Sequence, residues 1–187
     1  MRVCVFCSSS DAVEPRLLEQ GRGLGAALAG AGHEVLYGGT AVGTMGAVAA
    51  GAREAGGRVV GVLPGFLRDR GIADEACDEL VVTSTLLERK QQMLARSDGF
   101  VALPGGLGTL DELLEVVTHV YLGQLEGPVA VLDGDGFWDL LWDLLEDLEA
   151  RGMARSPDEV LQRCTDPAQV LTALKRAPGR PDAVWRA

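Results

Sequence analysis

The sequence predicts an α/β fold, a doubly wound and mainly parallel sheet in a Rossmann-like three-layer sandwich. Short apolar, β-rich segments alternate along the chain with segments of helical periodicity. Most of these strands are apolar at successive positions, which is typical of strands covered on both faces. The 187 residues, 47% of them hydrophobic, are enough for one core. We expect one domain over residues 1–178 and a flexible tail over 179–187.

In the first half of the chain, each expected strand is followed by a helix or a connection. A helix is expected from Pro15, a residue favoured at helix starts, to about Gly30. A second helix over 43–56 is rich in small residues that allow close packing on a sheet, and 64–78 is expected to be irregular. The expected strands are 2–7, 33–39, 58–64 and 79–83.

The second half continues the alternation. Thr85 and Glu88 form a capping-box pattern at the start of a helix expected over 84–97. Further strands are expected at 99–106, 127–133 and near 160–163, and further helices at 110–122, 136–150 and 166–175.

Composition excludes several classes of partner. The formal net charge is −10 and there is no basic cluster, which argues against a nucleic acid partner. No apolar run approaches the roughly 18 residues of a membrane span, and the apolar start is too short for a signal peptide. Cys4 and Cys7 have C-x-x-C spacing, but Cys4 lies inside an expected strand and no second pair follows. We therefore expect reduced thiols, no metal site and a cytoplasmic protein.

Two glycine-rich loops follow expected strands and open expected helices. Helix N-termini offer free N–H groups to anions, and glycine allows a phosphate to approach the backbone; the alternative is that the glycines only make tight turns. Neither loop has the dinucleotide or Walker A pattern, so we expect a mononucleotide or sugar phosphate. The candidate phosphate-binding residues are Gly38, Gly39, Gly43, Thr44, Gly105, Gly106, Gly108 and Thr109.

Arg89 and Lys90 lie about one turn into the helix that follows the fourth strand. Such residues often form a solvated face. Alternatively, the stem of Arg89 runs along the sheet edge, and its guanidinium binds a phosphate or carboxylate. Ser8, Ser9 and Ser10, which follow the first strand, either bind a ligand or only end the strand.

The helix expected after the second glycine loop carries Glu112, Glu115 and His119 on one face. Asp111 and Glu112 are expected in its first turn, where carboxylates also suit the helix dipole. We interpret His119 as a packing or surface residue.

The segment 137–148 has a broad apolar stripe, with two tryptophans beside it. One sheet face would not cover it all, so a homodimer is expected, with a thickly buried monomer as the alternative. The stripe is formed by Phe137, Leu140, Leu141, Leu144, Leu145 and Leu148.

The stretch PGGLGTLDE, residues 104–112, resembles the P-G-G-x-G-T-x-x-E motif of the Lonely Guy (LOG) family. These cytokinin-activating phosphoribohydrolases were long mislabelled as lysine decarboxylases. VCVFCSSS, YGGTAVGTMG, ERKQQM and SDGFVALPGG also occur in the family's order. The resemblance covers roughly residues 1–150.

The resemblance implies a hydrolase that uses no cofactor and is usually dimeric. It would cleave the N-glycosidic bond of an N6-modified adenosine 5′-monophosphate, or of AMP, releasing the base and ribose 5-phosphate. By the same resemblance, Arg89 and Glu112 are catalytic. Substrate contacts are implied for Lys90, Gly106, Leu107, Gly108, Thr109, Asp111, Glu112 and Thr118.

Two departures from the family pattern stand out. Ser8 replaces a glycine that is frequent in the first loop. Many members carry a substrate-contacting glutamate after the third strand, and Gly71 stands there in an ungapped count from Arg89. A shift of this loop would allow Asp69 or Asp74 to substitute.

The sequence also bears on two other functions. A lysine decarboxylase needs a lysine for pyridoxal phosphate, and neither Lys90 nor Lys175 lies in a convincing cofactor site. Related folds with the same glycine motif carry nucleotide-like cofactors such as molybdopterin, so a non-catalytic carrier is the serious alternative. A carrier would not require the pair Arg89 and Glu112.

Overall fold

The computed structural model describes residues 1–176, which form seven strands in one sheet. The strand order is β4-β3-β2-β1-β5-β6-β7, and all the neighbouring strands pair in parallel. This confirms the predicted doubly wound α/β class. The tail expected over 179–187 lies outside the described residues.

The elements alternate as predicted. The strands are β1 (Arg2–Phe6), β2 (Glu34–Tyr37), β3 (Val59–Pro64), β4 (Glu79–Thr83), β5 (Gly99–Ala102), β6 (Val129–Leu132) and β7 (Gln162–Cys164). The helices are α1 (Pro15–Gly30), α2 (Gly43–Glu54), α3 (Gly65–Arg68), α4 (Leu86–Ala95), α5 (Leu107–Tyr121), α6 (Asp139–Ala150) and α7 (Pro167–Ala173), with a 3₁₀ turn at Pro157–Glu159.

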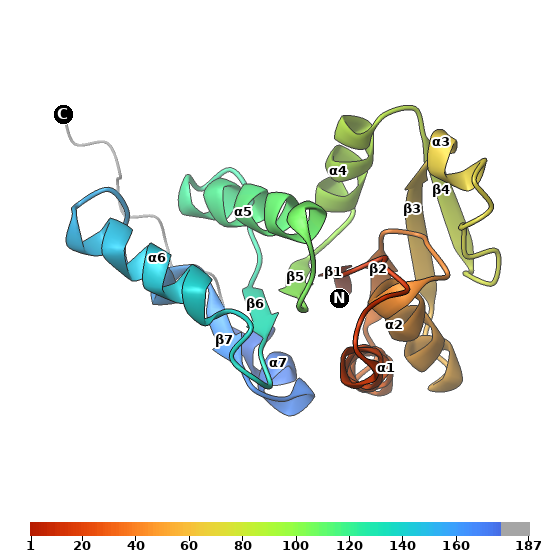
Figure 1. Cartoon of the computed structure of the whole chain (residues 1–187), viewed down its shortest axis with the longest axis horizontal. Coiled ribbons are helices and arrows are strands. Elements are labelled where there is room, and N and C mark those ends of the chain that lie inside the picture. Colours follow the sequence, from red (N-terminus) through yellow and green to blue (C-terminus); the bar gives the residue numbers. More distant parts are fainter. Residues whose placement is uncertain (177–187) are drawn as a thin grey trace.

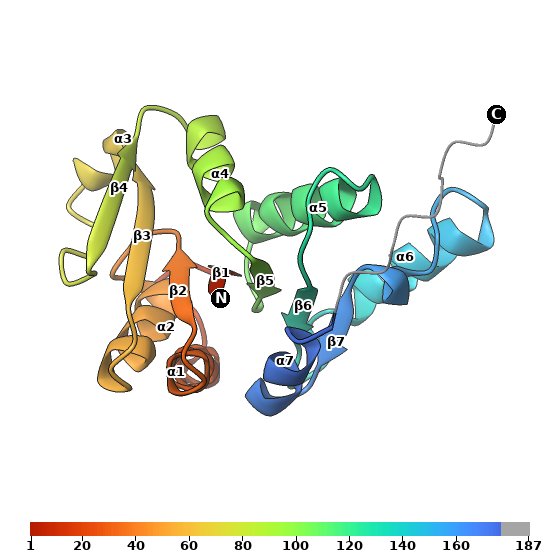
Figure 2. The same cartoon turned by 180° about the vertical axis from the view of Figure 1, so that it is seen from behind.

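The sheet separates two helical layers. Helices α1, α2 and α7 cover one face, and α4, α5 and α6 cover the other (Figures 1 and 2). Alternate residues of each strand enter the two cores; in β1, Val3 and Val5 face the first layer, and Cys4 and Phe6 the second. The strand order reverses at β1, which pairs with both β2 and β5. Open α/β sheets bind ligands at such a reversal, beyond the carboxyl ends of the strands.

Glycines bring α1 and α2 into backbone contact. A Cβ on Gly25 would lie 2.0 Å from the carbonyl oxygen of Val48, and one on Gly51 would lie 2.0 Å from that of Arg22. No side chain fits at either position. The small residues therefore allow the close packing expected from the sequence.

The structure corrects several element boundaries. The expected irregular segment 64–78 contains the short helix α3. Helix α5 begins at Leu107 rather than at 110, because Gly106 is extended (φ −90°, ψ −159°) and acts as its N-cap. Asp111 and Glu112 consequently lie beyond the first turn, which contains no acidic residue, and the prediction that they occupy it is wrong.

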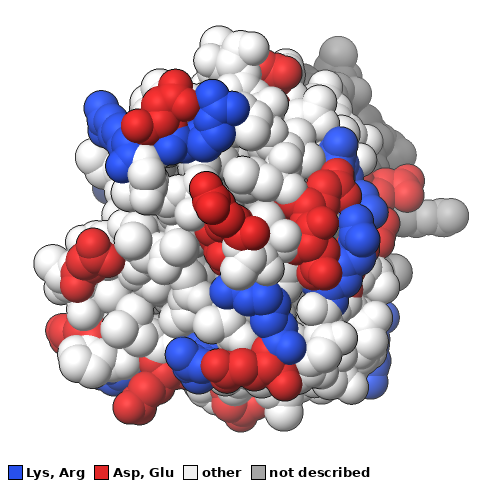
Figure 3. All heavy atoms as spheres, turned by 90° about the vertical axis from the view of Figure 1, so that its right-hand side faces the viewer, with Lys and Arg blue, Asp and Glu red and all other residues white. Residues whose placement is uncertain are grey.

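Charges of both signs are mixed on the surface. On the face that carries β4, basic and acidic side chains lie beside one another (Figure 3). Arg58 there pairs with Glu34 and Glu79. Within residues 1–176, no helix has the length and hydropathy needed to cross a membrane.

Candidate active site

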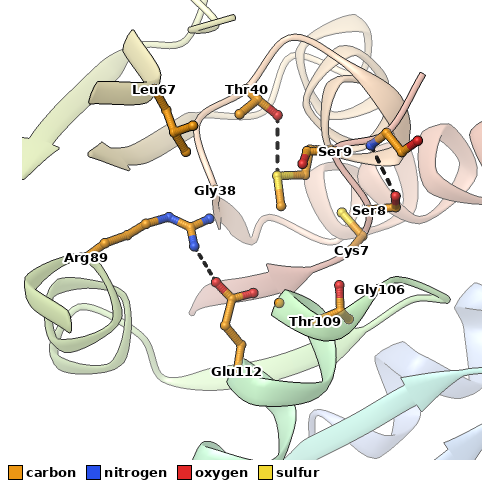
Figure 4. A pocket seen from close by; sticks show the side chains of 13 residues that line it. Cys7, Ser8, Ser9, Gly38, Thr40, Leu67, Arg89, Gly106, Thr109 and Glu112 are labelled. Atoms are coloured by element: carbon orange, nitrogen blue, oxygen red, sulfur yellow. Dashed lines mark hydrogen bonds and ion pairs between the residues drawn. The ribbon is translucent and has the colours of Figure 1, made fainter. Parts of the chain in front are cut away.

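A cavity of about 270 Å³ lies at the carboxyl ends of β1 and β5, where the strand order reverses. The loop after β1, the loop after β2, and helices α3, α4 and α5 contribute its walls (Figure 4). The lining residues are Cys7, Ser8, Ser9, Ser10, Gly38, Thr40, Met45, Leu67, Arg89, Gly106, Gly108, Thr109 and Glu112.

Arg89 enters this cavity from α4 and is only 8% exposed. The predicted capping box starts the helix, since the Thr85 hydroxyl accepts a hydrogen bond from the Glu88 N–H at 3.0 Å. The Arg89 Nε donates to the carbonyl oxygen of Val62 at 3.0 Å, and Nη1 donates to Glu112 Oε1 at 2.5 Å. Arg89 is therefore a fixed cation of the site and not part of a solvated face.

Glu112 lies in α5 and is 5% exposed. Burial raises the pKa of its carboxyl group above the usual value, and the charge and hydrogen bond of Arg89 only partly offset this. Arg89 binds Oε1, and the figure shows both side chains pointing toward each other across the cavity (Figure 4). A buried carboxylate with a raised pKa and a fixed cationic partner is a candidate acid–base group.

The N-terminus of α5 forms the wall of the cavity opposite Leu67 (Figure 4). Gly106 and Gly108 have no heavy atom within 4 Å of an added Cβ, so both leave open space. No side chain caps the N-terminal N–H groups of the helix. Free N–H groups and the positive end of the helix dipole make this wall suitable for a phosphate. Thr109, which is buried, adds a hydroxyl to the lining.

The loop after β1 closes the cavity from a third side. The Ser8 hydroxyl accepts a hydrogen bond from the Ser10 N–H at 3.1 Å, and the Ser8 carbonyl accepts one from the Met45 N–H at 3.0 Å. Cys7 is buried, and burial followed by the charge of Glu112 raises the pKa of its thiol. The thiol is therefore neutral, and it is a poor nucleophile.

Several predicted site residues do not line the cavity. Thr44 is fully buried, and its methyl group lies against Gly21. Leu107 is 86% exposed, and the Thr118 hydroxyl donates to the carbonyl of Leu114. The Lys90 ammonium forms ion pairs with the Asp111 and Glu115 carboxylates of α5. The predicted residues outside the lining are Gly39, Gly43, Thr44, Lys90, Gly105, Leu107, Asp111 and Thr118.

The segment after β3 supplies no carboxylate to the lining. Gly71 adopts a positive φ of 74° in an exposed turn, and Asp69 is exposed and pairs with Arg68. Asp74 is 3% exposed, and it accepts hydrogen bonds from Tyr37 at 2.7 Å and from Arg53 at 2.6 Å. Among the described lining residues, Glu112 is the one carboxylate.

Sequence reasoning missed Cys7, Leu67, Thr40 and Met45 as lining residues. Leu67 lies on α3, which has no buried residue and therefore no apolar periodicity that would reveal it. Thr40 lies in the first glycine loop and Met45 lies in the first turn of α2. The prediction there selected the neighbouring glycines and Thr44 as phosphate-binding residues.

The cysteines follow the prediction of free thiols. Cys4 and Cys7 contribute to cores on opposite faces of the sheet, so their spacing does not form a paired site. Within residues 1–176, no group of three or more His, Cys, Asp or Glu side chains is arranged to hold a metal ion.

A buried Arg–Glu pair beside a glycine-rich helix N-terminus defines a site for a small phosphorylated molecule. Comparison with known proteins agrees with this class. Residues 45–174 match the family model described as "Possible lysine decarboxylase". A cytokinin riboside 5′-monophosphate phosphoribohydrolase of Mycobacterium marinum is 47% identical over 150 residues, 80% of each chain. One of Mycobacterium tuberculosis is 48% identical over 137 residues, 73% of each chain. The chain belongs to this family, the LOG family.

Solved structures show the same fold. A target of the Northeast Structural Genomics Consortium has a TM-score of 0.70 at 29% identity, covering 91% of this chain and 96% of that one. The molybdenum cofactor binding protein from Rippkaea orientalis also has a TM-score of 0.70. At 24% identity over 93% of this chain and 94% of its own, the latter is evidence of a shared fold alone.

Proposed function

We propose that this protein is a phosphoribohydrolase acting on N6-modified adenosine 5′-monophosphates of the cytokinin riboside class, or on AMP. Water would replace the base at C1′, giving the free base and ribose 5-phosphate. The observation that carries the proposal is the buried Arg89–Glu112 pair, 2.5 Å apart, beside the open N-terminus of α5. The named mycobacterial relatives support the choice of substrate class.

The residues around the cavity assign a role to each part of the substrate. The 5′-phosphate would accept hydrogen bonds from the backbone N–H groups of Gly106 and Gly108 and from the Thr109 hydroxyl. Glu112, which follows on the same helix, would then face the ribose. As the base leaves, positive charge builds on the ribose ring, and a carboxylate stabilises it.

Arg89 leaves Glu112 with one oxygen free for catalysis. Because Oε1 accepts the Arg89 hydrogen bond, Oε2 is available to orient a water molecule and to take its proton as the water attacks C1′. The raised pKa of Glu112 makes it a stronger base than an ordinary carboxylate. The charge of Arg89 also favours the ionised form of this carboxylate.

The base would occupy the end of the cavity near Leu67. Figure 4 shows this side chain across the cavity from Gly106 and Thr109. Since no lining carboxylate is described there, recognition of the base would depend on apolar contacts more than on an acidic side chain. An apolar N6 substituent fits that environment.

We also infer a homodimer and a cytoplasmic location. Trp138, which precedes α6, and Trp142 of α6 enter the core, whereas Leu140 is 82% and Leu144 is 54% exposed. Leu114 on the neighbouring helix α5 is 41% exposed. A second copy of the chain is the natural cover for such apolar side chains. The free cysteines support a reducing compartment.

The decisive experiment incubates the protein with AMP and with N6-isopentenyl AMP and measures released base and ribose 5-phosphate. We expect release from both, lowered by roughly 10²-fold or more in Glu112→Gln, the scale of a lost acid–base group. Circular dichroism checks that the variant remains folded. Tight binding of either nucleotide with no release of base would favour a carrier and overturn the proposed hydrolase.

A further inference from the structure

A second set of ion pairs joins α4 to α5 beside the Arg89–Glu112 pair. The Lys90 ammonium lies 3.0 Å from Asp111 Oδ2 and 3.0 Å from Glu115 Oε2. Adjacent residues of α4 therefore bind three carboxylates of α5. Lys90 does not line the cavity.

The two carboxylates that bind Lys90 differ in exposure. The Asp111 side chain is 61% exposed, whereas that of Glu115 is 25% exposed and that of Lys90 is 18% exposed. Solvent and salt screen exposed pairs strongly and half-buried pairs much less. The Lys90–Glu115 pair is therefore screened less than the Lys90–Asp111 pair.

These ion pairs lie where α4 and α5 approach each other (Figure 1). The apolar part of this junction consists of Met93 from α4, Val116 from α5 and Phe6 from β1, all in one core. Apolar contacts alone tolerate small rotations of a helix, whereas the half-buried Lys90–Glu115 pair adds an electrostatic link that opposes separation of the two helices. The Lys90–Glu115 pair thus helps to hold α5 where the Glu112 carboxylate meets Arg89.

We propose that Glu115 is a positioning residue, which acts through Lys90 to hold α5 against α4 and so places the Glu112 carboxylate for reaction. This inference rests on the proposed hydrolase. Glu115 itself would not touch the substrate, since it lies outside the cavity lining.

The charges around Glu112 determine how it should respond to substitution. The charge of Glu112 interacts with Arg89 and Lys90 from α4, with Asp111 from its own helix, and with the neutral thiols of Cys4 in β1 and Cys7 just after it. Lys90 lowers the pKa of Glu112. Loss of the Glu115 charge leaves Lys90 less neutralised, so the pKa of Glu112 should fall; loss of Lys90 should raise it.

The test compares pH profiles of kcat/KM for AMP in Glu115→Gln and Lys90→Met. Glu112 must be ionised to act as a base, so its pKa determines the pH at which kcat/KM falls on the acid side of the profile, the acid limb. We expect this limb to move down by about half a pH unit in Glu115→Gln and up by a similar amount in Lys90→Met, the scale of a screened charge at a neighbouring site. At the plateau, Glu115→Gln should lower kcat several-fold with little change in KM.

Control variants separate positioning from general destabilisation. Glu115→Asp keeps the charge and should restore the acid limb, and Glu126→Gln, at an exposed site after α5, should leave it unchanged. Thermal unfolding of each variant confirms folding. This inference would be overturned if the acid limbs of Glu115→Gln and Lys90→Met stay in place, or if both move in the same direction. Base release by the unaltered protein would still uphold the proposed hydrolase in that case. Absence of base release by the unaltered protein would overturn both.

Discussion

Gly38 is the position where the smallest change should disable the site. A Cβ added there would lie 2.2 Å from Arg89 Nη2 and 2.6 Å from Met45 Sδ. Ordinary contact begins at 3.4 Å, so the guanidinium would have to move by roughly 1 Å. That movement breaks the 2.5 Å hydrogen bond to Glu112. A misplacement of about 1 Å costs on the order of 10²-fold in rate, which is the loss we expect in kcat/KM for Gly38→Ala.

The same substitution should have little effect on stability. The clashing atoms are the ends of the Arg89 and Met45 side chains rather than backbone, and the cavity gives them room to shift, so we expect a loss of about 1 kcal/mol in the free energy of unfolding. Base release from AMP and urea denaturation measure the two effects. Gly23→Ala, in a helix with nothing within 4 Å of the added Cβ, is the matched control. Near-normal kcat/KM in a folded Gly38→Ala variant would refute the role given to the Arg89–Glu112 geometry.

Three further predictions concern the base end, the buried network and the exposed helix. Leu67→Ala should lower kcat/KM for N6-isopentenyl AMP about 10-fold relative to AMP, whereas the exposed Phe66→Ala should not; equal losses for both nucleotides would contradict this. Burial raises the pKa of Asp74, but hydrogen bonds from Arg53, Tyr37 and a backbone N–H outweigh it and hold that pKa below the usual value. Asp74→Asn should therefore lower the free energy of unfolding by about 2–3 kcal/mol at pH 7, and the difference should shrink as the pH falls below about 4, because the stabilisation exists only while Asp74 is ionised; a pH-independent difference in urea denaturation would argue against it. Leu140→Lys should convert a dimer into a monomer in light scattering, and an unchanged mass would place the interface elsewhere.

The order of elements followed from hydrophobic periodicity, because apolar strands alternate with amphipathic segments along most of the chain. Boundaries near glycine were less predictable. The glycine loop and the start of α5 overlap, since Gly106 caps a helix whose first turn includes Gly108. Glycine's low helix propensity hides such a turn from pattern analysis.

The residues of the candidate site also differ in how far the sequence predicted them. Arg89 and Glu112 were recognisable from their motifs, and the structure places their side chains in contact. Asp74, the alternative acid, lies outside the cavity lining, because its partners Tyr37 and Arg53, distant in sequence, hold it elsewhere in the fold. Leu67 gave no signal, because a short helix without buried residues has no periodicity. The positions of Asp74 and Leu67 relative to the cavity depend on long-range packing rather than on local sequence.

The backbone contact between α1 and α2 has a mechanical consequence for catalysis. Helices locked through Gly25 and Gly51 cannot slide past one another, so the loops that precede them move as one rigid body. The Met45 N–H bond to the Ser8 carbonyl joins these loops directly. These contacts oppose movement of the part of the cavity wall that the two loops form. We therefore expect any closure around a substrate to come from the other part, where α3 has no buried residue to hold it in place.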